Sequence, residues 1–136
     1  MMMPRARARS LGILRSLVPA SLVVACSSDC VYYPCPLPEA AEISVTASNT
    51  AVGVPGLMLA ISGTVVGTVP CQHGPGAASV CHILGGPGAY RAELSAPGYQ
   101  VASIGFTVTG TAAGCNTCGH VDRQLLSVVL QPAIGP

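Results

Sequence analysis

The densest group of residues able to do chemistry in this sequence consists of cysteines and histidines in glycine-containing stretches. Thiolate and imidazole are ligands that zinc prefers, and the spacing of Cys115 and Cys118 is typical of a zinc knuckle. The same Cys-x-x-Cys spacing occurs in thioredoxin-type redox motifs. Haem attachment is excluded because Gly119, not histidine, follows Cys118. The whole group is Cys71, His73, Cys81, His82, Cys115, Cys118 and His120.

Disulfide bonds are the interpretation that we favour for these cysteines. Seven cysteines in a chain of 136 residues are typical of a protein exported to an oxidising compartment. The redox alternative lacks the βαβ context of a thioredoxin, whereas the metal alternative stays open. On the favoured interpretation, in which the cysteines are paired, we predict no metal ligand and no cofactor. Proximity in the sequence favours the pairs Cys30–Cys35, Cys71–Cys81 and Cys115–Cys118, and the alternative is cross-pairing between the loops that hold the last two pairs.

No other motif predicts catalysis, so we expect no catalytic residue and no enzyme. The sequence contains no Gly-x-Ser-x-Gly elbow that would expose a nucleophile. The run Gly85-Gly86-Pro87-Gly88 is rich in glycine, but no helix follows it as a phosphate loop requires, and we expect a hairpin connection there. Glu39 and Glu42 are the closest acidic pair, and we expect both to be solvated.

Charge is sparse and uneven along the chain. Four of the six arginines lie within the first fifteen residues, and there is no lysine. From Cys26 onward, two arginines face five acidic residues, which gives a net charge of −3. A surface of this kind lacks the basic patch that nucleic-acid binding requires.

The first 25 residues have the organisation of a signal peptide. A basic segment precedes a short apolar run, Ser16–Ala25, which is too short to span a bilayer. The run ends in Leu-Val-Val-Ala-Cys26, which resembles the bacterial lipobox. This resemblance implies cleavage before Cys26, diacylglyceryl transfer to its sulfur and fatty acylation, for example with palmitate, of the new amino terminus. The alternative is an ordinary secretory peptide followed by a chance cysteine.

The resemblance also implies a location. The chain would be held in the cell envelope by a lipid in the membrane. Ser27 follows the lipidated residue where the enterobacterial signal for inner-membrane retention has aspartate, which favours the outer membrane. Residues 26–41 contain three prolines within five residues, and we predict a tether there because proline fixes φ and removes a hydrogen-bond donor.

Short β-rich runs separated by glycine and proline fill residues 42–132. Their spacing predicts one small all-β domain, a seven-stranded antiparallel sandwich of Greek-key type that is stapled by disulfides. The predicted strands are 42–48, 57–62, 64–69, 79–84, 88–96, 100–109 and 123–130. Alternation within them predicts the core residues Ile43, Val45, Leu59, Ile61, Tyr90, Leu94, Ile104, Phe106, Val108, Leu126, Val128 and Leu130.

Residues 88–100 resemble the hallmark of carboxypeptidase regulatory-like domains, which are transthyretin-like sandwiches. In that family a Gly-x-Tyr strand leads through an Ala-x-Gly-Tyr turn to a second strand, and Tyr90 and Tyr99 match the two tyrosines. Pro97-Gly98 suits the centre of a type II turn. The resemblance covers roughly residues 42–130 and implies an accessory, non-catalytic module.

Three functions remain open from the sequence. We favour a non-catalytic structural or binding module displayed on a lipid anchor, with an envelope protein or a glycan as the kind of partner. The second is a metal-binding envelope protein that uses the Cys/His loops. The third is an accessory subunit of an envelope complex.

Overall fold

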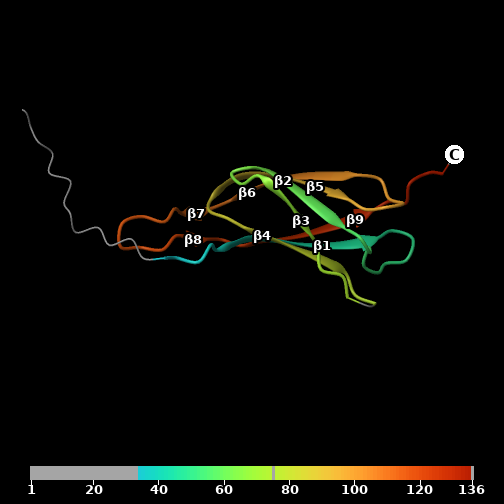
Figure 1. Cartoon of the computed structure of the whole chain (residues 1–136), viewed down its shortest axis with the longest axis horizontal. Helices are drawn as coiled ribbons and strands as arrows, with labels where there is room; N and C mark the ends of the chain where they lie inside the picture. Colours follow the sequence, from blue (N-terminus) through green and yellow to red (C-terminus); the bar gives the residue numbers. More distant parts are fainter. Residues whose placement is uncertain (1–33, 75, 136) are drawn as a thin grey trace, which may run out of the picture.

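Strands and loops make up all of the chain that the computed structural model describes, which is residues 34–74 and 76–135 (Figure 1). None of these residues belongs to a helix able to cross a membrane. The strands are β1 (Glu39–Ala47), β2 (Met58–Gly63), β3 (Gly67–Pro70), β4 (Ser79–Leu84), β5 (Gly88–Ser95), β6 (Ala102–Val108), β7 (Gly110–Thr111), β8 (His120–Val121) and β9 (Gln124–Leu130). The predicted all-β fold class is confirmed, and the seven predicted runs correspond to β1–β6 and β9.

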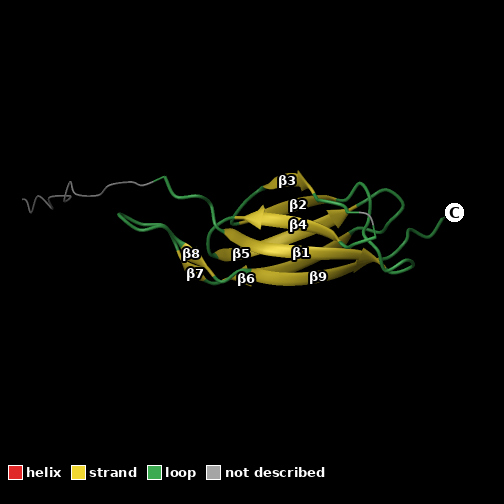
Figure 2. Cartoon of the chain, turned by 90° about the horizontal axis from the view of Figure 1, so that it is seen from below, coloured by secondary structure: helices red, strands yellow, loops and turns green. Residues whose placement is uncertain are grey.

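Two sheets lie face to face and form a sandwich (Figure 2). One has the strand order β4-β1-β9 and the other β3-β2-β5-β6. The chain crosses repeatedly from one sheet to the other, as in a Greek key. All pairs in the two sheets are antiparallel except β1 and β9, which run parallel from Ala41 opposite Gln124 to Ala47 opposite Leu130. The short strands β7 and β8 form a separate hairpin that the sequence did not predict.

The core lies between the sheets and is mostly aliphatic. Alternate residues of each strand point inward because side chains on a strand alternate between its two faces. Most of the predicted core residues are buried, and Ile83 and Val54 join them although neither was predicted. The exceptions are Ile104, Phe106 and Leu126, which are only partly buried. All three lie on β6 or β9, the strands at one open side of the sandwich.

The hairpin between β5 and β6 shows how local sequence determines this fold. The Tyr99 N–H donates to the Ala96 carbonyl at 3.2 Å, and Gly98 has a φ of 81°. These are the features of a type II turn, where only glycine adopts the required positive φ without strain. The rings of Tyr90 and Phe106 stack across the hairpin with centroids 5.4 Å apart. Burial raises the pKa of Tyr90 above that of a free tyrosine.

Two predictions were wrong, one about where the first strand begins and one about the connection between β4 and β5. Strand β1 begins at Glu39 rather than at residue 42, because Glu39 and Ala41 already pair with Leu84 and Ile83 of β4, with a shift of register between them. The tether therefore ends at Pro38. The run from Gly85 to Gly88 is not a hairpin connection, because it joins β4 in one sheet to β5 in the other.

Ser79 is the buried polar residue of the core. Its Oγ accepts a hydrogen bond from the Val54 N–H and donates one to the Val54 carbonyl, each at 2.8 Å. Both backbone groups of Val54 are thereby satisfied away from water. The hydroxyl ties the turn after β1 to the start of β4.

We expect Ser79→Ala to lower the free energy of unfolding by about 1–3 kcal/mol, because it leaves the buried Val54 N–H without a partner. Denaturant unfolding followed by circular dichroism measures this difference. Ser62→Ala, on the exposed face of β2, is the matched control and should change stability by less than about 0.5 kcal/mol. Equal effects from the two substitutions would contradict the role given to Ser79.

Candidate functional site

The bridge between Cys71 and Cys81 connects the two sheets. Cys71 follows the end of β3 in one sheet, whereas Cys81 lies in β4 of the other and is 1% exposed. Beside the bridge, Gln72 and Val80 each donate a backbone N–H to the other's carbonyl at 2.8 Å. The predicted pairing of these cysteines is confirmed, and it fastens the loop between them to the edge of β4.

The second bridge joins Cys35 to Cys118, which lie 83 residues apart in the sequence. It overturns two predicted pairs, Cys30–Cys35 and Cys115–Cys118. Cys115 is also disulfide-bonded. The reason is spatial: β7 and β8 project from the sandwich at the end where residues 34–38 enter it, so Cys118 meets the tether (Figures 1 and 2). Cys26, with its lipidation motif, and Cys30 lie outside the described residues.

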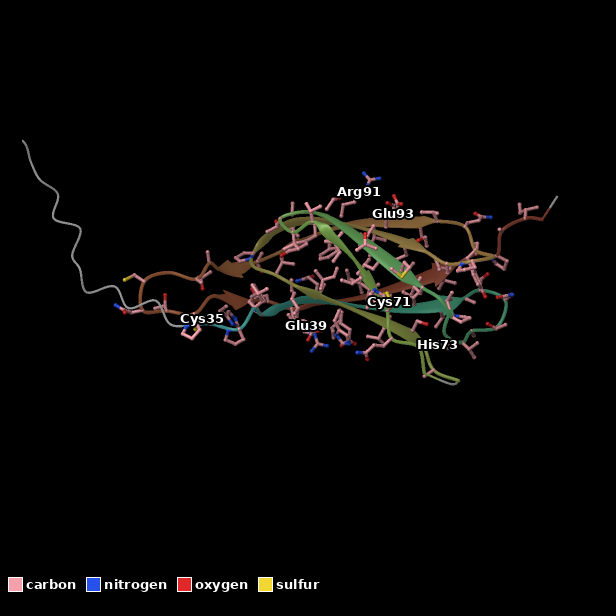
Figure 3. The ribbon with its side chains drawn as sticks, in the orientation of Figure 1. Cys35, Glu39, Cys71, His73, Arg91 and Glu93 are labelled. Carbon is pink, nitrogen blue, oxygen red and sulfur yellow. A yellow bond between two sulfur atoms is a disulfide. The ribbon has the colours of Figure 1, made fainter. Side chains whose placement is uncertain are left out.

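The cysteines and histidines do not converge on one metal site. Cys71, Cys81, Cys115 and Cys118 are all in disulfides, so none offers a thiolate. Figure 3 shows Cys35 near one end of the molecule, Cys71 in the middle and His73 toward the other end. Each histidine has a separate neighbour: His73 contacts Ser79, His82 contacts Glu39, and His120 contacts Asp122.

One cluster of charged residues does form, on the outer face of the β4-β1-β9 sheet. Glu39 and Glu42 of β1 and His82 of β4 place one possible ligand atom each within 4.8 Å of the others. His82 Nδ1 lies 2.6 Å from a Glu39 oxygen. Arg123, just before β9, pairs with both carboxylates, at 3.4 Å from Glu39 and closely with Glu42. The guanidinium thus already supplies the cation that two adjacent carboxylates need.

The expectation that Glu39 and Glu42 are simply solvated was therefore wrong. The register places His82 directly across from Glu42, and the parallel strand β9 brings Arg123 to the same end of β1. Strand pairing of this kind has no signal in local sequence. The cluster ties the outer strands of the sheet to the start of β1.

We expect Arg123→Gln to cost about 1 kcal/mol or less of unfolding free energy, because its side chain is 43% exposed and solvent screens the pairs. The loss should shrink in about 1 M salt, where the Debye length is about 3 Å. Arg91→Gln is the control, since Arg91 makes no ion pair with the described residues. A loss that is unchanged by salt would contradict the ion-pair interpretation.

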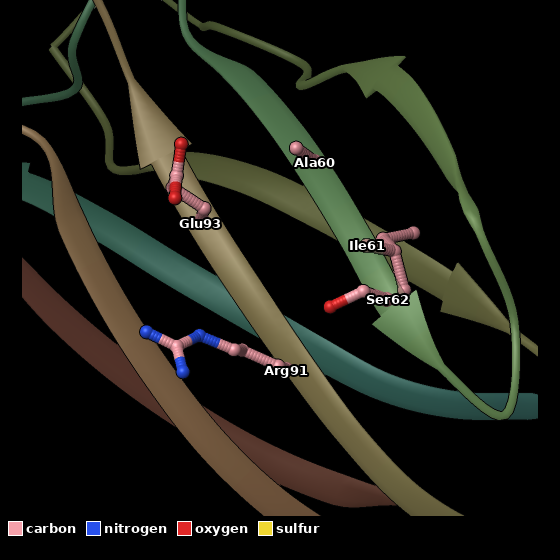
Figure 4. A pocket seen from close by; sticks show the side chains of 5 residues that line it. All are labelled: Ala60, Ile61, Ser62, Arg91 and Glu93. Atoms are coloured by element: carbon pink, nitrogen blue, oxygen red, sulfur yellow. The ribbon is translucent and has the colours of Figure 1, made fainter.

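A shallow polar hollow lies on the opposite outer face, on the β3-β2-β5-β6 sheet. Arg91 and Glu93 stand on β5, and Ala60, Ile61 and Ser62 of β2 complete its lining (Figure 4). A second hollow on the other side of Arg91 is lined by Ser103, Ile104 and Gly105 of β6.

The strand register explains these hollows. Ser62 and Gly105 flank Arg91 across the sheet, while Ala60 and Ser103 flank Glu93. Because all four neighbours are small, the two charged side chains stand above a low surface. The lining of both hollows has no histidine, cysteine or tyrosine. Such a surface offers a cation, a carboxylate and hydroxyl groups to a polar ligand.

A third, apolar hollow lies where the tether meets the projecting hairpin. Its lining includes Cys35, Leu37 and Pro38 of the tether, Pro87 of the β4–β5 connection, Thr111 of β7 and Ala113 after that strand. The Gly85 N–H donates to the Pro38 carbonyl at 2.9 Å and holds the connection against the tether. Residues 35–38 are therefore fastened to the sandwich rather than free of it.

Comparison with known proteins adds no identification. No protein-family model matches the sequence, and no curated protein is significantly similar to it.

Proposed function

We propose that this chain is a non-catalytic, lipid-anchored protein of the bacterial cell envelope whose sandwich acts as a structural or binding module. The observation that carries the proposal is the attachment of the tether by Cys35–Cys118 to one end of the sandwich. Cys26 precedes Cys35 by nine residues. A lipid there would hold the domain close to a membrane, with the β7–β8 end facing it.

Three further features support this proposal. The disulfides require an oxidising compartment, which an exported protein enters. The sandwich and the type II turn at Pro97-Gly98 agree with the resemblance to carboxypeptidase regulatory-like domains. The outer faces of both sheets lie along the sides of the molecule, away from the end that would face the membrane (Figure 3). They would therefore remain accessible to a partner.

We propose that the partner binds at the surface around Arg91 and Glu93. This partner would be an envelope glycan or an envelope protein with polar groups. Small neighbours leave both charges open to a ligand, and a bidentate contact from the guanidinium to a carboxylate would orient it. The role of accessory subunit in an envelope complex uses the same surface and differs only in the partner. Metal binding by the Cys/His loops is not favoured, because their cysteines are paired.

Labelling of the full chain in cells with a radioactive fatty acid, followed by fractionation, tests the anchor. We expect the label on the protein, recovery in the membrane fraction, and accumulation of the uncut form when the lipoprotein signal peptidase is inhibited. Recovery of an unlabelled protein in the soluble fraction would contradict the proposal.

A further inference from the structure

One side of the sandwich consists of two edge strands that carry no charge. Strand β6 has the sequence Ala-Ser-Ile-Gly-Phe-Thr-Val, and β9 has Gln-Leu-Leu-Ser-Val-Val-Leu. Edge strands of soluble proteins are commonly protected from pairing by charged residues, proline, a bulge or short length. Strand β9 has none of these: it is seven residues long and pairs with β1 in continuous register.

The other edges of the sandwich are protected. Gln72 covers the outer edge of β4 through its two hydrogen bonds with Val80. Strand β3 has only four residues and ends at Pro70, which has no N–H to offer. The lack of protection is therefore specific to the side formed by β6 and β9.

Within the described chain, backbone hydrogen bonds link the segments of β6 and β9 only beyond the ends of the two strands. The Asp122 N–H donates to the Thr109 carbonyl at one end, and the Gln100 N–H donates to the Gln131 carbonyl at the other, both at 2.8 Å. Between these points the strands belong to different sheets, and no pairing joins them. The backbone edge of β9 between Gln124 and Leu130 is thus left unpaired in the described chain.

Apolar side chains are exposed along this unpaired edge. Leu125 is 72% exposed and Val129 is 53% exposed, both on the outer face of β9. On the inner face, Ile104, Phe106 and Leu126 are the predicted core residues that stay only partly buried. Both faces of the open side therefore lack the apolar cover that a second strand would supply.

The sequence of β9 is complementary to itself. In an antiparallel pair centred on Ser127, Leu125 lies opposite Val129 of the second copy, and Leu126 lies opposite its Val128. Apolar residues that face each other across strands stabilise a sheet. Strand β6 has a similar symmetry about Gly105, with Ile104 and Phe106 on either side. The same two-fold rotation thus brings apolar residues together on both layers.

Charge and area also fit a second copy. Asp122 and Arg123 would lie opposite Pro132 and Gln131 of the other chain, so no like charges meet. Seven antiparallel residues span about 24 Å, and the sheets are about 10 Å apart, so with outward side chains the contact buries on the order of 1,000 Å² in total. This area is at the lower limit for a specific interface.

We propose that the β6–β9 side is a homodimer interface in which β9 pairs antiparallel with β9 of a second copy. The pairing continues the β4-β1-β9 sheet into its symmetry mate and makes one sheet of six strands. The small area predicts a dimer that dissociates at low concentration. Confinement of both copies to one surface would favour it by raising their effective concentration.

Sedimentation of the purified full chain over a range of concentrations tests the interface, whichever cell fraction contains the protein. We expect wild type to form a dimer and Val129→Lys to remain monomeric, because the ammonium groups oppose burial along the edge. Val66→Lys is the matched control: Val66 is 81% exposed in the β2–β3 loop, and this variant should dimerise as wild type does. Unchanged circular dichroism in both variants shows that the fold is retained.

Ser127→Cys provides a second measurement that does not depend on weakening the contact. Two copies centred on this residue place their Cα atoms about 5 Å apart, within reach of a disulfide. We expect a covalent dimer under mild oxidation, and none from Val66→Cys. The proposal is overturned if wild type is monomeric throughout, if Val129→Lys still dimerises, or if the Ser127→Cys variant forms no covalent dimer. Fatty-acid labelling reports on the anchor and these measurements report on the interface, so failure of one proposal would be recognised separately from failure of the other.

Discussion

Cys26→Ala is expected to remove the fatty-acid label and to move the protein from the membrane to the soluble fraction. Alanine has no sulfur to carry the diacylglyceryl group, and each buried methylene contributes about 0.8 kcal/mol to anchoring. Attachment by basic residues does not replace the lipid, because the sequence from Cys26 onward has no lysine and a net charge of −3. A polybasic patch that could bind anionic lipids is thus missing. The change should be close to complete.

Ser27→Ala is the control for this experiment, since it alters the neighbouring residue and keeps the sulfur. It should be labelled and retained like wild type. Persistent label on Cys26→Ala would show that the lipid is elsewhere or that the lipobox resemblance is accidental. If Cys26 carries lipid, Cys30 is the cysteine left to pair with Cys115, and mass mapping of peptides from the unreduced protein should find that link.

Replacement of both Cys71 and Cys81 by alanine should lower the free energy of unfolding by about 3 kcal/mol or more. Closing a loop of about ten residues restricts the unfolded chain by an amount close to this. The loss of packing around the buried Cys81 adds to it. Since small domains are stable by only about 5–15 kcal/mol, this loss is a large share of the total stability. Denaturant unfolding monitored by circular dichroism measures the change.

A second variant separates the two causes of this loss. Cys71→Ala with Cys81→Val fills the buried position but cannot form the bridge. We expect it to recover only the packing part, so that most of the destabilisation remains. Full recovery would mean that the disulfide contributes little and that the pair stabilises the fold by its volume alone.

Local sequence predicted the strands because each depends on residues close to one another. In β5, Tyr90, Ala92 and Leu94 alternate with Arg91 and Glu93, and this pattern alone gives the buried and exposed faces. The turn at Gly98 follows equally from its own residues. It was therefore predictable that the side chains of Arg91 and Glu93 point to the outer face of the sheet. The hollows around them were not, because these depend on small residues in β2 and β6 brought alongside by strand register.

Features that depend on position within a sheet were beyond such reasoning. Alternation points Ile104, Phe106 and Leu126 inward, but it does not reveal that β6 and β9 are edge strands, which leaves these side chains partly exposed. The pairing of Cys35 depends on a hairpin whose strands have two residues each, too short for any periodicity. Proximity in the sequence was the wrong guide there.

The separation of Cys35 from Cys118 affects how an exported chain would mature. A chain that crosses a membrane amino terminus first presents Cys35 to the oxidising side long before Cys118 follows, 83 residues later. Cys30 is already there, so pairing in order of arrival would join Cys30 to Cys35, which is not the native bond. Thiol–disulfide exchange must then reshuffle it. Correct maturation would thus depend on a disulfide isomerase in the envelope as well as on an oxidase.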